Sequence, residues 1–378
     1  MEEKKKRIKE GIVPISFVVD SDLPDFKKYR GPNGQSFDMD CPFCGGKHKL
    51  NINVNKNVFR CNRCQKSGNA LTLHNLLIGG ERSAALKDLK KRFAGIAVES
   101  QVRYTELPED NTVPPAPLGI RDFAYREMLK HLVLSDAHRE NLHKRGLSDE
   151  DIERLGYKTV PVVGLSLIAK KTIGGIPIDR GGIPGFYDIT TENPKLVKRK
   201  NGYLVPVKTI NGKISGFQIR FDPLPDNATA EERERFHKYA WFTSGEKETG
   251  CSVTGCENIH FAGDWTTKDE AVYLTEGALK ADVASVLSGK KFIGITGVNN
   301  TSQLPKVLKT LKKNGVKYVC VCVDMDYREK QEVANALAKI KEMIIEAGLK
   351  CPTLHWDEKY KGIDDFLLSQ KKERKVND

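Results

Sequence analysis

Short apolar runs that end at polar residues dominate the last third of the chain. Residues 271–274 are apolar and lead to Glu276, after which apolar residues recur at helical spacing. Residues 318–323 form a second run, rich in β-branched side chains, and the segment between the two runs predicts a strand at 292–296 and a helix at 303–313. Strands that alternate with helices predict a parallel sheet, whose ligands bind at the carboxyl ends of the strands. The pattern therefore predicts an α/β region within a chain that is α+β overall.

Three acidic residues follow these two runs. Glu276 ends the first, and Asp324 and Asp326 follow the second, two positions apart, so that both side chains point the same way if the segment is extended. Carboxylates gathered at one sheet edge repel one another unless a cation joins them, and hard oxygen ligands select Mg²⁺ or Mn²⁺. We therefore expect a divalent metal site here, although acids in such positions also serve as helix caps.

Four cysteines nearer the amino end have the spacing of a zinc site. Cys41 and Cys44 form one CxxC pair, and Cys61 and Cys64 form a second pair after a gap of sixteen residues. Apolar residues alternate with asparagines between the pairs, which predicts a hairpin and hence a zinc ribbon. A disulfide pairing is disfavoured because the first residues are charged and have no export signal. His48 is an alternative ligand to Cys44.

Other cysteines and one aromatic residue have simpler interpretations. Cys320 and Cys322 alternate within a predicted strand and are expected to be core side chains. Cys251 and Cys256 lie in a Gly-rich loop without further His or Cys nearby, which disfavours a second metal site. Phe59 could stack on a nucleic-acid base, but packing against a predicted helix at 70–77 is the preferred interpretation.

Composition and charge narrow the range of partners. The 378 residues suffice for two to three domains, and the formal net charge of +12 favours a polyanionic partner. Nucleic acid is the expected polyanion, because a zinc ribbon and a metal site suited to phosphates accompany the charge. No apolar run approaches the roughly 20 residues of a membrane span, and a GxxxxGK[ST] phosphate loop is absent. Reduced cysteines and no export signal predict a cytoplasmic protein.

Changes in composition also divide the chain into segments. A proline-rich stretch at 105–118 is too polar to be buried and marks a linker. The following helical region contains Ser148, a good N-cap, with Asp151 at the third helical position. Two later strands are joined through Asn211-Gly212, a preferred hairpin turn. The predicted segments are a basic lead-in and zinc ribbon (1–98), a linker (99–118), a helical and β-hairpin region (119–269), the acidic sheet (270–370) and a basic tail (371–378).

Taken in order, the motifs resemble those of DNA primases of the bacterial DnaG type and the related phage primases. Residues 41–64 are similar to the zinc motif of that family, and RGLSDEDIERLGYKTVP is similar to the segment that opens its polymerase domain. GYLVPVKTINGKISGFQIR resembles its basic hairpin, with Arg220 at the arginine, and HKYAWFTSG places Lys238 at a basic position. LTEGALKADVA and VCVDMDYR resemble its TOPRIM metal motifs. KGIDDFLL resembles a trailing acidic motif, which offers Asp364 or Asp365 as a further ligand.

The resemblance covers roughly residues 39–370 and implies a fold and an activity. The implied fold is an N-terminal zinc ribbon followed by a primase polymerase domain that contains a TOPRIM parallel-sheet subdomain. The implied activity is that of a nucleotidyltransferase which makes short RNA primers on single-stranded DNA from nucleoside triphosphates, with structural Zn²⁺ and catalytic Mg²⁺ or Mn²⁺. Glu276, Asp324 and Asp326 would be catalytic. Residues implied in nucleic-acid or nucleotide binding are Lys49, Asn51, Asn53, Arg63, Lys198, Arg199, Lys200, Arg220 and Lys238.

Two further implications concern the setting of the protein. A replicative helicase is a candidate partner, whereas a membrane is not. The usual carboxyl-terminal helicase-binding domain does not follow the acidic sheet, which favours a compact primase of a phage, plasmid or other mobile element.

The chain departs from the family pattern at one critical position. Lys280 stands where the EGxxD motif has its acid, and Asp282 lies two positions further on, about 200° around a helix of 3.6 residues per turn. Asp282 is therefore not expected to replace the missing ligand. Two alternatives stay open. One is a TOPRIM nuclease, because such a metal site also serves nucleases. The other is a non-catalytic single-stranded-DNA-binding replication or mobilisation factor, which Lys280 favours.

Overall fold

The computed structural model describes residues 13–23, 36–54, 57–61, 63–64, 66–99, 113–174, 176, 181–297, 301–322, 324 and 331–377. The chain divides into two compact units, Met1–Asp110 and Asn111–Asp378, and each is described by itself. Among the helices of these residues, none combines the length and the apolar character that a bilayer span requires.

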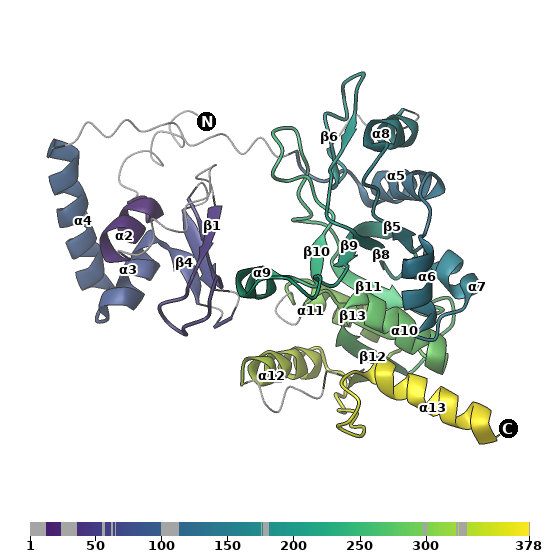
Figure 1. The fold of residues 1–378 in the computed structure, drawn as a ribbon. Helices are drawn as coiled ribbons and strands as arrows, with labels where there is room; N and C mark the ends of the chain where they lie inside the picture. The colour runs from purple at the N-terminus through teal and green to yellow at the C-terminus, as the bar shows by residue number, and fades with distance from the viewer. Residues whose placement is uncertain are drawn as a thin grey trace. The chain divides into compact units, whose positions relative to one another are not determined.

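The first unit is an antiparallel sheet covered by helices (Figure 1). Its elements are α2 (Ile15–Asp22), β1 (Ser36–Met39), β2 (Leu50–Asn53), β3 (Val58–Cys61), β4 (Ser67–Asn69), α3 (Ala70–Ile78) and α4 (Arg82–Glu99). The strands pair in the order β1-β2-β3-β4, and β2 and β3 form the predicted hairpin with Leu50 opposite Cys61. The outer strands β1 and β4 were not predicted, because they lie outside the alternating segment between the two CxxC pairs.

The core of the first unit explains why the hairpin sequence alternates. Leu50 and Ile52 are fully buried, whereas the asparagines between them are partly exposed. Phe59 is 2 % exposed and packs in the same cluster as Leu73 of α3, so the packing interpretation of Phe59 is confirmed. His74 of α3 is also fully buried, where its ring nitrogens lie 2.6 Å from Asp22 and 2.9 Å from Asp88. This contact ties α3 to α2 and α4.

The second unit begins with helices and an antiparallel sheet. Its first elements are α5 (Leu118–Lys130), α6 (Asp136–His143), α7 (Asp149–Leu155), β5 (Lys158–Thr159), α8 (Leu165–Ile173), β6 (Phe186–Tyr187), β7 (Lys195–Leu196), β8 (Gly202–Lys208), β9 (Ile214–Phe221), α9 (Ala230–Arg235) and β10 (Tyr239–Trp241). Ser148 caps α7 in a full capping box with Asp151, as predicted. β8 and β9 form the predicted hairpin, and Gly212 in its loop has φ +69°, a value that favours glycine. β5, β8, β9 and β10 form one sheet.

The rest of the second unit contains the predicted parallel sheet. Its elements are β11 (Ile259–Ala262), β12 (Ala271–Glu276), α10 (Ala278–Ser288), β13 (Phe292–Ile295), α11 (Leu304–Lys313), β14 (Tyr318–Val321), α12 (Gln331–Glu346) and α13 (Ile363–Asn377). The strand order is β11-β13-β12-β14, and β12 pairs in parallel with both β13 and β14. The predicted α/β arrangement is therefore confirmed, within a chain that is α+β overall. The structure adds β11, which runs antiparallel at the edge.

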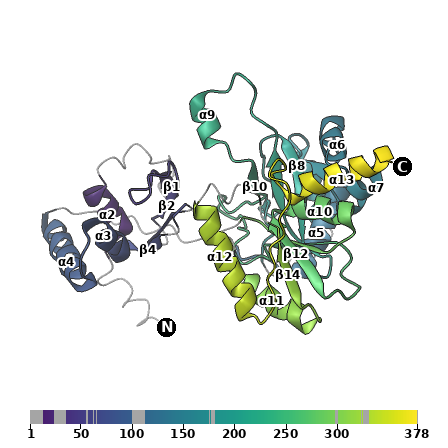
Figure 2. The same cartoon turned by 90° about the horizontal axis from the view of Figure 1, so that it is seen from below.

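Helices cover both faces of this sheet (Figures 1 and 2). Val272 and Leu274 of β12 pack in one cluster with residues of α11 and α12, whereas Tyr273 between them packs on the other side with α10 and α13. The turn from β12 into α10 lies at the carboxyl edge of the sheet, because β12 ends there. The first turn of α13 reaches the same place, because α13 packs along α10. Glu276, Asp324 and Asp364 lie at this edge.

Candidate functional site

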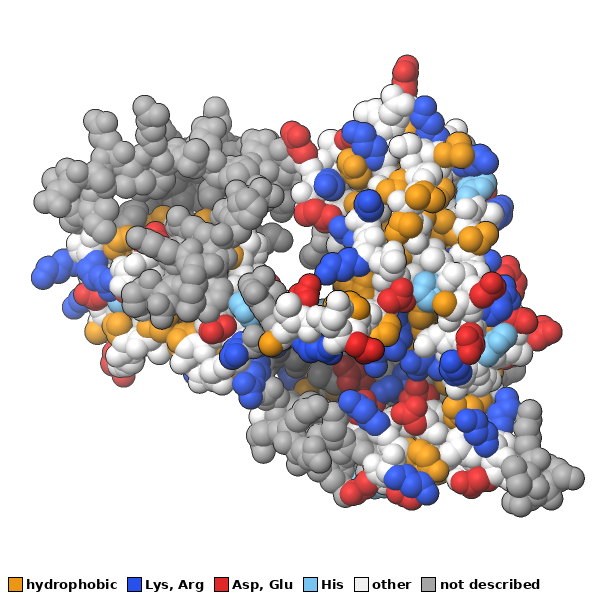
Figure 3. All heavy atoms as spheres, in the orientation of Figure 1, with side chains coloured by type: hydrophobic (Ala, Val, Ile, Leu, Met, Phe, Trp, Pro, Cys, Tyr) orange, Lys and Arg blue, Asp and Glu red, His pale blue; other side chains and the backbone are white. Residues whose placement is uncertain are grey.

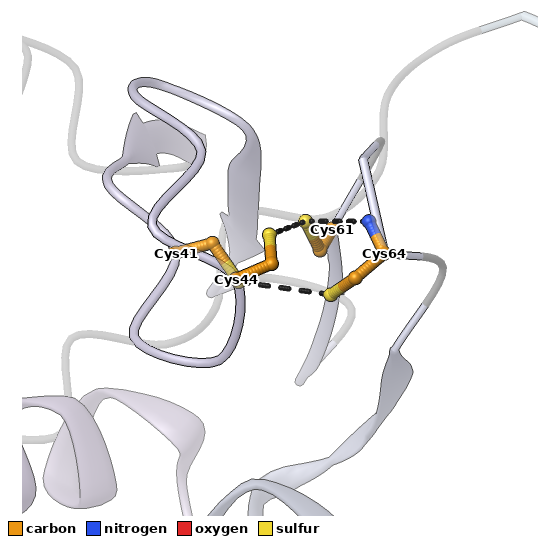
Figure 4. Close-up of side chains that lie close together, drawn as sticks. All are labelled: Cys41, Cys44, Cys61 and Cys64. Carbon is orange, nitrogen blue, oxygen red and sulfur yellow. Dashed lines mark hydrogen bonds between the residues drawn. The ribbon is translucent and has the colours of Figure 1, made fainter. Parts of the chain in front are cut away.

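Four thiols of the first unit face one another beside the hairpin (Figure 4). Cys41 Sγ lies 3.8 Å from Cys64 Sγ, Cys44 Sγ lies 3.8 Å from Cys61 Sγ, and all four sulfur atoms are within 4.8 Å of one another. Tetrahedral zinc with Zn–S bonds of about 2.3 Å requires sulfur atoms about 3.8 Å apart. The cluster can therefore hold one zinc ion, as the spacing predicts.

Backbone donors prepare this cluster for a cation. The N–H groups of Arg63 and Cys64 each lie 3.3 Å from Cys61 Sγ. Burial raises the pKa of Cys61, but these two donors and the neighbouring thiols outweigh it, so that the pKa lies below its ordinary value. A thiolate, not a thiol, is the metal ligand. Hydrogen-bond donors next to a ligand atom orient it and tune its basicity.

His48 does not belong to the cluster. It has φ +50°, and its backbone N–H donates to Asp40 Oδ1 at 2.9 Å. Because Cys44 is one of the four clustered residues, the alternative of His48 as a ligand is wrong. The turn that contains His48 brings its neighbour Lys49 back across Gly46.

The predicted nucleic-acid residues of the first unit lie on and around the hairpin. Lys49 and Arg63 both pack over Gly46, where a Cβ would lie 3.1 Å and 2.6 Å from their side chains. The amide NH₂ of Asn51 donates to Asp38 (2.8 Å) and Ser36 (3.0 Å) on β1 and is therefore engaged within the sheet. Asn53 lies at the end of β2 and is partly exposed. Only Lys49 and Arg63 are brought together.

The acids predicted from the second unit gather at the carboxyl ends of β12 and β14. Glu276 is the last residue of β12, and the strand pairing continues beyond β14 through the Cys322 N–H, which donates to Leu274 O at 2.7 Å. Asp324 follows two residues later. The strand β14 ends at Val321, earlier than predicted. Asp326 lies outside the described residues, so its predicted convergence with Asp324 stays a prediction.

Lys280 lies in the middle of these acids. Its ammonium donates a hydrogen bond to Asp324 Oδ1, and the two side chains are only 18 % and 14 % exposed. Burial lowers the pKa of Lys280, but the charges of Asp324, Asp364 and Glu276 outweigh it and hold the pKa above its ordinary value. We call Glu276, Asp324 and Asp364 the acid site. It has a resident positive charge at its centre.

Asp364 comes from the first turn of α13. It is 6 % exposed, and its Oδ1 is buried without a hydrogen-bond partner among the described residues. Arg145 Nη1 approaches the other oxygen at 3.7 Å. Burial raises the pKa of Asp364, although Lys280 and Arg145 oppose it. The neighbouring Asp365 is exposed and accepts a hydrogen bond from the Gly362 N–H at 3.3 Å, so it acts as a helix cap.

The donor set of the acid site suits a hard divalent cation. All of its ligand atoms are carboxylate oxygens, and a buried oxygen of Asp364 lacks a partner. Among the described residues, however, only the four cysteines form a group whose ligand atoms lie within 4.8 Å of one another. Because Lys280 already neutralises Asp324, the described part of the site fits fewer cations than the sequence motif implies.

Asp282, two residues after Lys280, points away from the acid site, as predicted. Its carboxylate accepts hydrogen bonds from Tyr157 Oη (2.6 Å) and from His260 Nε2 (2.9 Å). The Lys208 N–H donates to His260 Nδ1 at 3.0 Å, which assigns the ring proton to Nε2. Asp282 therefore braces α10 against β8, β11 and the end of α7.

Four cations lie beside the acid site and form what we call the cation cluster: Arg145, Arg220, Lys238 and Lys361. Desolvation, followed by the charges of Arg220, Arg145, Lys361 and Lys280, lowers the pKa of Lys238. Arg220 stacks over Tyr239 at 5.4 Å, and its Nη1 is buried without a hydrogen-bond partner in the described structure. A buried donor without an acceptor costs free energy, and an anion is one group that could accept a hydrogen bond from it.

On the face drawn in Figure 3, Lys and Arg side chains of the second unit are interspersed with Asp and Glu.

The predicted basic run at 198–200 forms part of the wall of a pocket of about 890 Å³. Its lining residues are Val162, Lys198, Arg199, Lys200, Asn201, Phe221, Phe236, His237, Ala240, Trp241 and Thr243. Lys198 and Lys200 are exposed, whereas Arg199 is held by Glu246 (2.6 Å) and by the Thr243 carbonyl. Cations beside aromatic rings suit a nucleic-acid strand, whose bases stack while its phosphates are neutralised.

Sequence reasoning missed several residues of both sites. Arg145 and Lys361 are the first residues of the motifs RGLSDEDIERLGY and KGIDDFLL, but nothing in their local pattern distinguishes them from the other charged residues nearby. Phe236 and Trp241 were visible as aromatic residues within a basic stretch. That signal could have identified the pocket.

Comparisons with known proteins give the following. Residues 264–374 match a family described as a domain of unknown function, DUF3854. No curated protein matches the chain. The crystal structure of the zinc-binding and RNA polymerase domains of Aquifex aeolicus primase is similar at 15 % identity and a TM-score of 0.47, over 96 % of this chain and 84 % of that one.

Two more solved structures are similar to this chain. The catalytic core of E. coli primase has 16 % identity and a TM-score of 0.46, over 67 % of this chain and 75 % of that one. The primase fragment of the bacteriophage T7 primase-helicase protein has 11 % identity and a TM-score of 0.34, over 90 % and 97 %. All three are structures of primases or primase fragments.

Proposed function

We propose that this protein is a DNA primase, a nucleotidyltransferase that joins nucleotides into a short RNA primer on single-stranded DNA. One observation carries the proposal: the acid site and the cation cluster adjoin at Lys280, which interacts with Asp324, Asp364 and Glu276 and also with Lys238. A triphosphate substrate needs both kinds of group, because its oxygens are neutralised by cations while a metal ion is held by carboxylates. The order of the sequence motifs supports the same activity.

In this proposal Glu276, Asp324 and Asp326 hold a divalent ion, Mg²⁺ or Mn²⁺, with Asp364 as a further ligand. Such an ion, when bound, stabilises negative charge on the phosphates as pyrophosphate leaves. The carboxylates themselves fix the position of the reacting phosphate relative to the sheet edge. The strand ends and the first turn of α10 supply a rigid base for them.

The cation cluster would bind the triphosphate. Arg220 has a buried Nη1 without a partner, and a guanidinium donates to two phosphate oxygens at once. Burial, and after it the surrounding cations, lower the pKa of Lys238, and an incoming polyanion would offset the repulsion from those cations.

The template would be bound by two surfaces. In the second unit, the pocket beside 198–200 offers aromatic faces and the exposed cations Lys198 and Lys200. In the first unit, Lys49 and Arg63 lie together over Gly46 beside the zinc cluster. A replicative helicase as partner, a cytoplasmic location and an origin in a mobile element stay predictions from the sequence.

The experiment is a primer-synthesis assay with the full chain. The protein is incubated with single-stranded DNA, labelled ribonucleotides and Mg²⁺ or Mn²⁺, beside the variants Glu276→Gln and Asp324→Asn. Glu270→Gln is the matched control, because Glu270 is exposed and pairs with Lys317 at the opposite end of β12. Primers made by the wild type and the control, and lost in both acid-site variants, support the proposal.

A second candidate is a single-stranded-DNA-binding module without activity. The ion pair between Lys280 and Asp324 favours it, because the pair occupies an acid that catalysis would need. Binding of DNA without any product in the same assay would support this candidate and contradict the primase. Shortened template would instead support a nuclease.

A further inference from the structure

Lys280 occupies a position in which its charge acts on the whole acid site. It lies in the first turn of α10, four residues after Glu276 at the end of β12, and its ammonium reaches Asp324 after β14. Asp364 lies on its other side, at the start of α13. The three carboxylates therefore come from three different elements and share one lysine.

Gly362 allows the lysine to reach this place. A Cβ at position 362 would lie 3.2 Å from Lys280 Nζ and 2.4 Å from Asp364 Oδ1. The backbone before α13 thus passes directly against the ammonium, where a side chain would collide. Lys280 is enclosed by protein rather than directed to solvent, and only 18 % of its side chain is exposed.

An enclosed ammonium must be matched by negative charge, and the acids must be matched by positive charge. Asp324 receives its match from Lys280. Asp364 has an oxygen, Oδ1, that lacks any partner among the described residues. Within the described residues, the Asp364 side of the site is therefore where a further cation is needed.

We propose that the Lys280 ammonium permanently takes the place of one divalent ion, so that the acid site binds a single Mg²⁺ or Mn²⁺. This inference rests on the proposed function, because it presumes that the acid site binds metal. Lys280 is a positioning residue in this arrangement: it holds Asp324 and limits the number of ions. An acid at the same position would instead add a ligand and admit a second ion.

The test is a titration of Mn²⁺ into the zinc-loaded full chain, followed by electron paramagnetic resonance of free Mn²⁺. The variants are Lys280→Glu and Lys280→Met, with Lys317→Met as the control, since Lys317 pairs with Glu270 on the surface. We expect one tight Mn²⁺ for the wild type and the control, and two for Lys280→Glu. Lys280→Met removes the charge without adding a ligand, and should bind Mn²⁺ roughly tenfold more tightly.

The following results would contradict the inference. Two tight Mn²⁺ ions in the wild type, or unchanged binding in Lys280→Met, would overturn the inference. If Lys280→Glu does not fold, as a thermal melt would reveal, Lys280→Met still gives the answer. Glu276→Gln separates the two proposals: if it leaves all Mn²⁺ binding unchanged in every background, the acid site itself is not a metal site and the proposed function fails with it.

Discussion

The Tyr157 hydroxyl donates a hydrogen bond of 2.6 Å to Asp282, although 125 positions separate the two residues. Asp282 is 2 % exposed and lies on the face of α10 opposite the acid site. Its partners come from the end of the helical region and from β11. The contact thus orients the helix that carries Lys280, which connects the stability of the second unit to the geometry of its site.

Asp282 should contribute stability that depends on pH. Burial raises the pKa of Asp282, but interactions with His260, Lys208 and Tyr157 outweigh it and hold the pKa below its ordinary value of 3.8. The folded protein therefore favours the charged form, so this stability is present above pH 3.8 and is lost as the pH falls toward the lower folded pKa. Asp282→Asn should lower the free energy of unfolding at pH 7 by about 3–5 kcal/mol.

Urea unfolding, measured at several values between pH 3 and pH 7, tests this prediction. The difference in free energy of unfolding between Asp282→Asn and the wild type should become smaller toward pH 3. Tyr157→Phe, which removes one donor and leaves the charge, should cost about 1.5–3 kcal/mol. An equal gap at all pH values would show that the Asp282 charge does not provide the stability.

Zinc binding should depend on each of the four clustered thiols. Cys61→Ser replaces a buried sulfur that two backbone N–H groups approach, and an alcohol is a poor ligand for zinc. We expect the zinc content to fall from about one ion per chain to nearly none, with loss of the fold of the first unit, because metal binding and folding are coupled. Atomic emission and circular dichroism measure the two effects.

The control for zinc is Cys351→Ser. Cys351 lies in the second unit outside the cluster, and its pKa is raised by burial. This variant should keep its zinc. Unchanged zinc in Cys61→Ser would rule out the four-thiolate site.

Arg220 should act on nucleotide binding more than on folding. Arg220→Gln removes a guanidinium whose Nη1 is buried and has no hydrogen-bond partner among the described residues. The substitution should therefore weaken the binding of a triphosphate. A charge-assisted hydrogen bond contributes about 1.5–3 kcal/mol, which corresponds to roughly a 10- to 150-fold higher Kd for the nucleotide. Fluorescent-nucleotide titration measures it. Arg139→Gln, at an exposed pair with Asp149, should leave Kd unchanged.

The aromatic pocket should bind bases by stacking. Phe236 is a partly exposed aromatic residue of that pocket, next to the end of α9. Phe236→Ala should weaken binding of single-stranded DNA by about 1–3 kcal/mol if one base stacks on the ring. Phe236→Tyr keeps the ring and should bind as the wild type does. Equal loss in both variants, by fluorescence anisotropy, would contradict stacking.

The sequence by itself determined the features that neighbouring residues encode. Two CxxC pairs around an alternating segment predicted the zinc ribbon, and an apolar run that ends at Glu276 predicted β12 and the turn into α10. The same reasoning identified the β8–β9 hairpin, since Asn-Gly between two alternating runs is a local signal. Such patterns are readable because backbone geometry repeats every two or 3.6 residues.

Only the tertiary structure decided which distant groups share one place. Lys280 was identified as a departure from a motif, but its pairing with Asp324 depends on β12 and β14 lying side by side. Arg145 joins the site because it approaches Asp364 on α13, 219 positions away in the chain. Strand order and helix packing create these contacts, and the local periodicity of the sequence does not predict them. For the same reason Asp282 could be excluded as a ligand from its helical angle, whereas its role as a brace could not be foreseen.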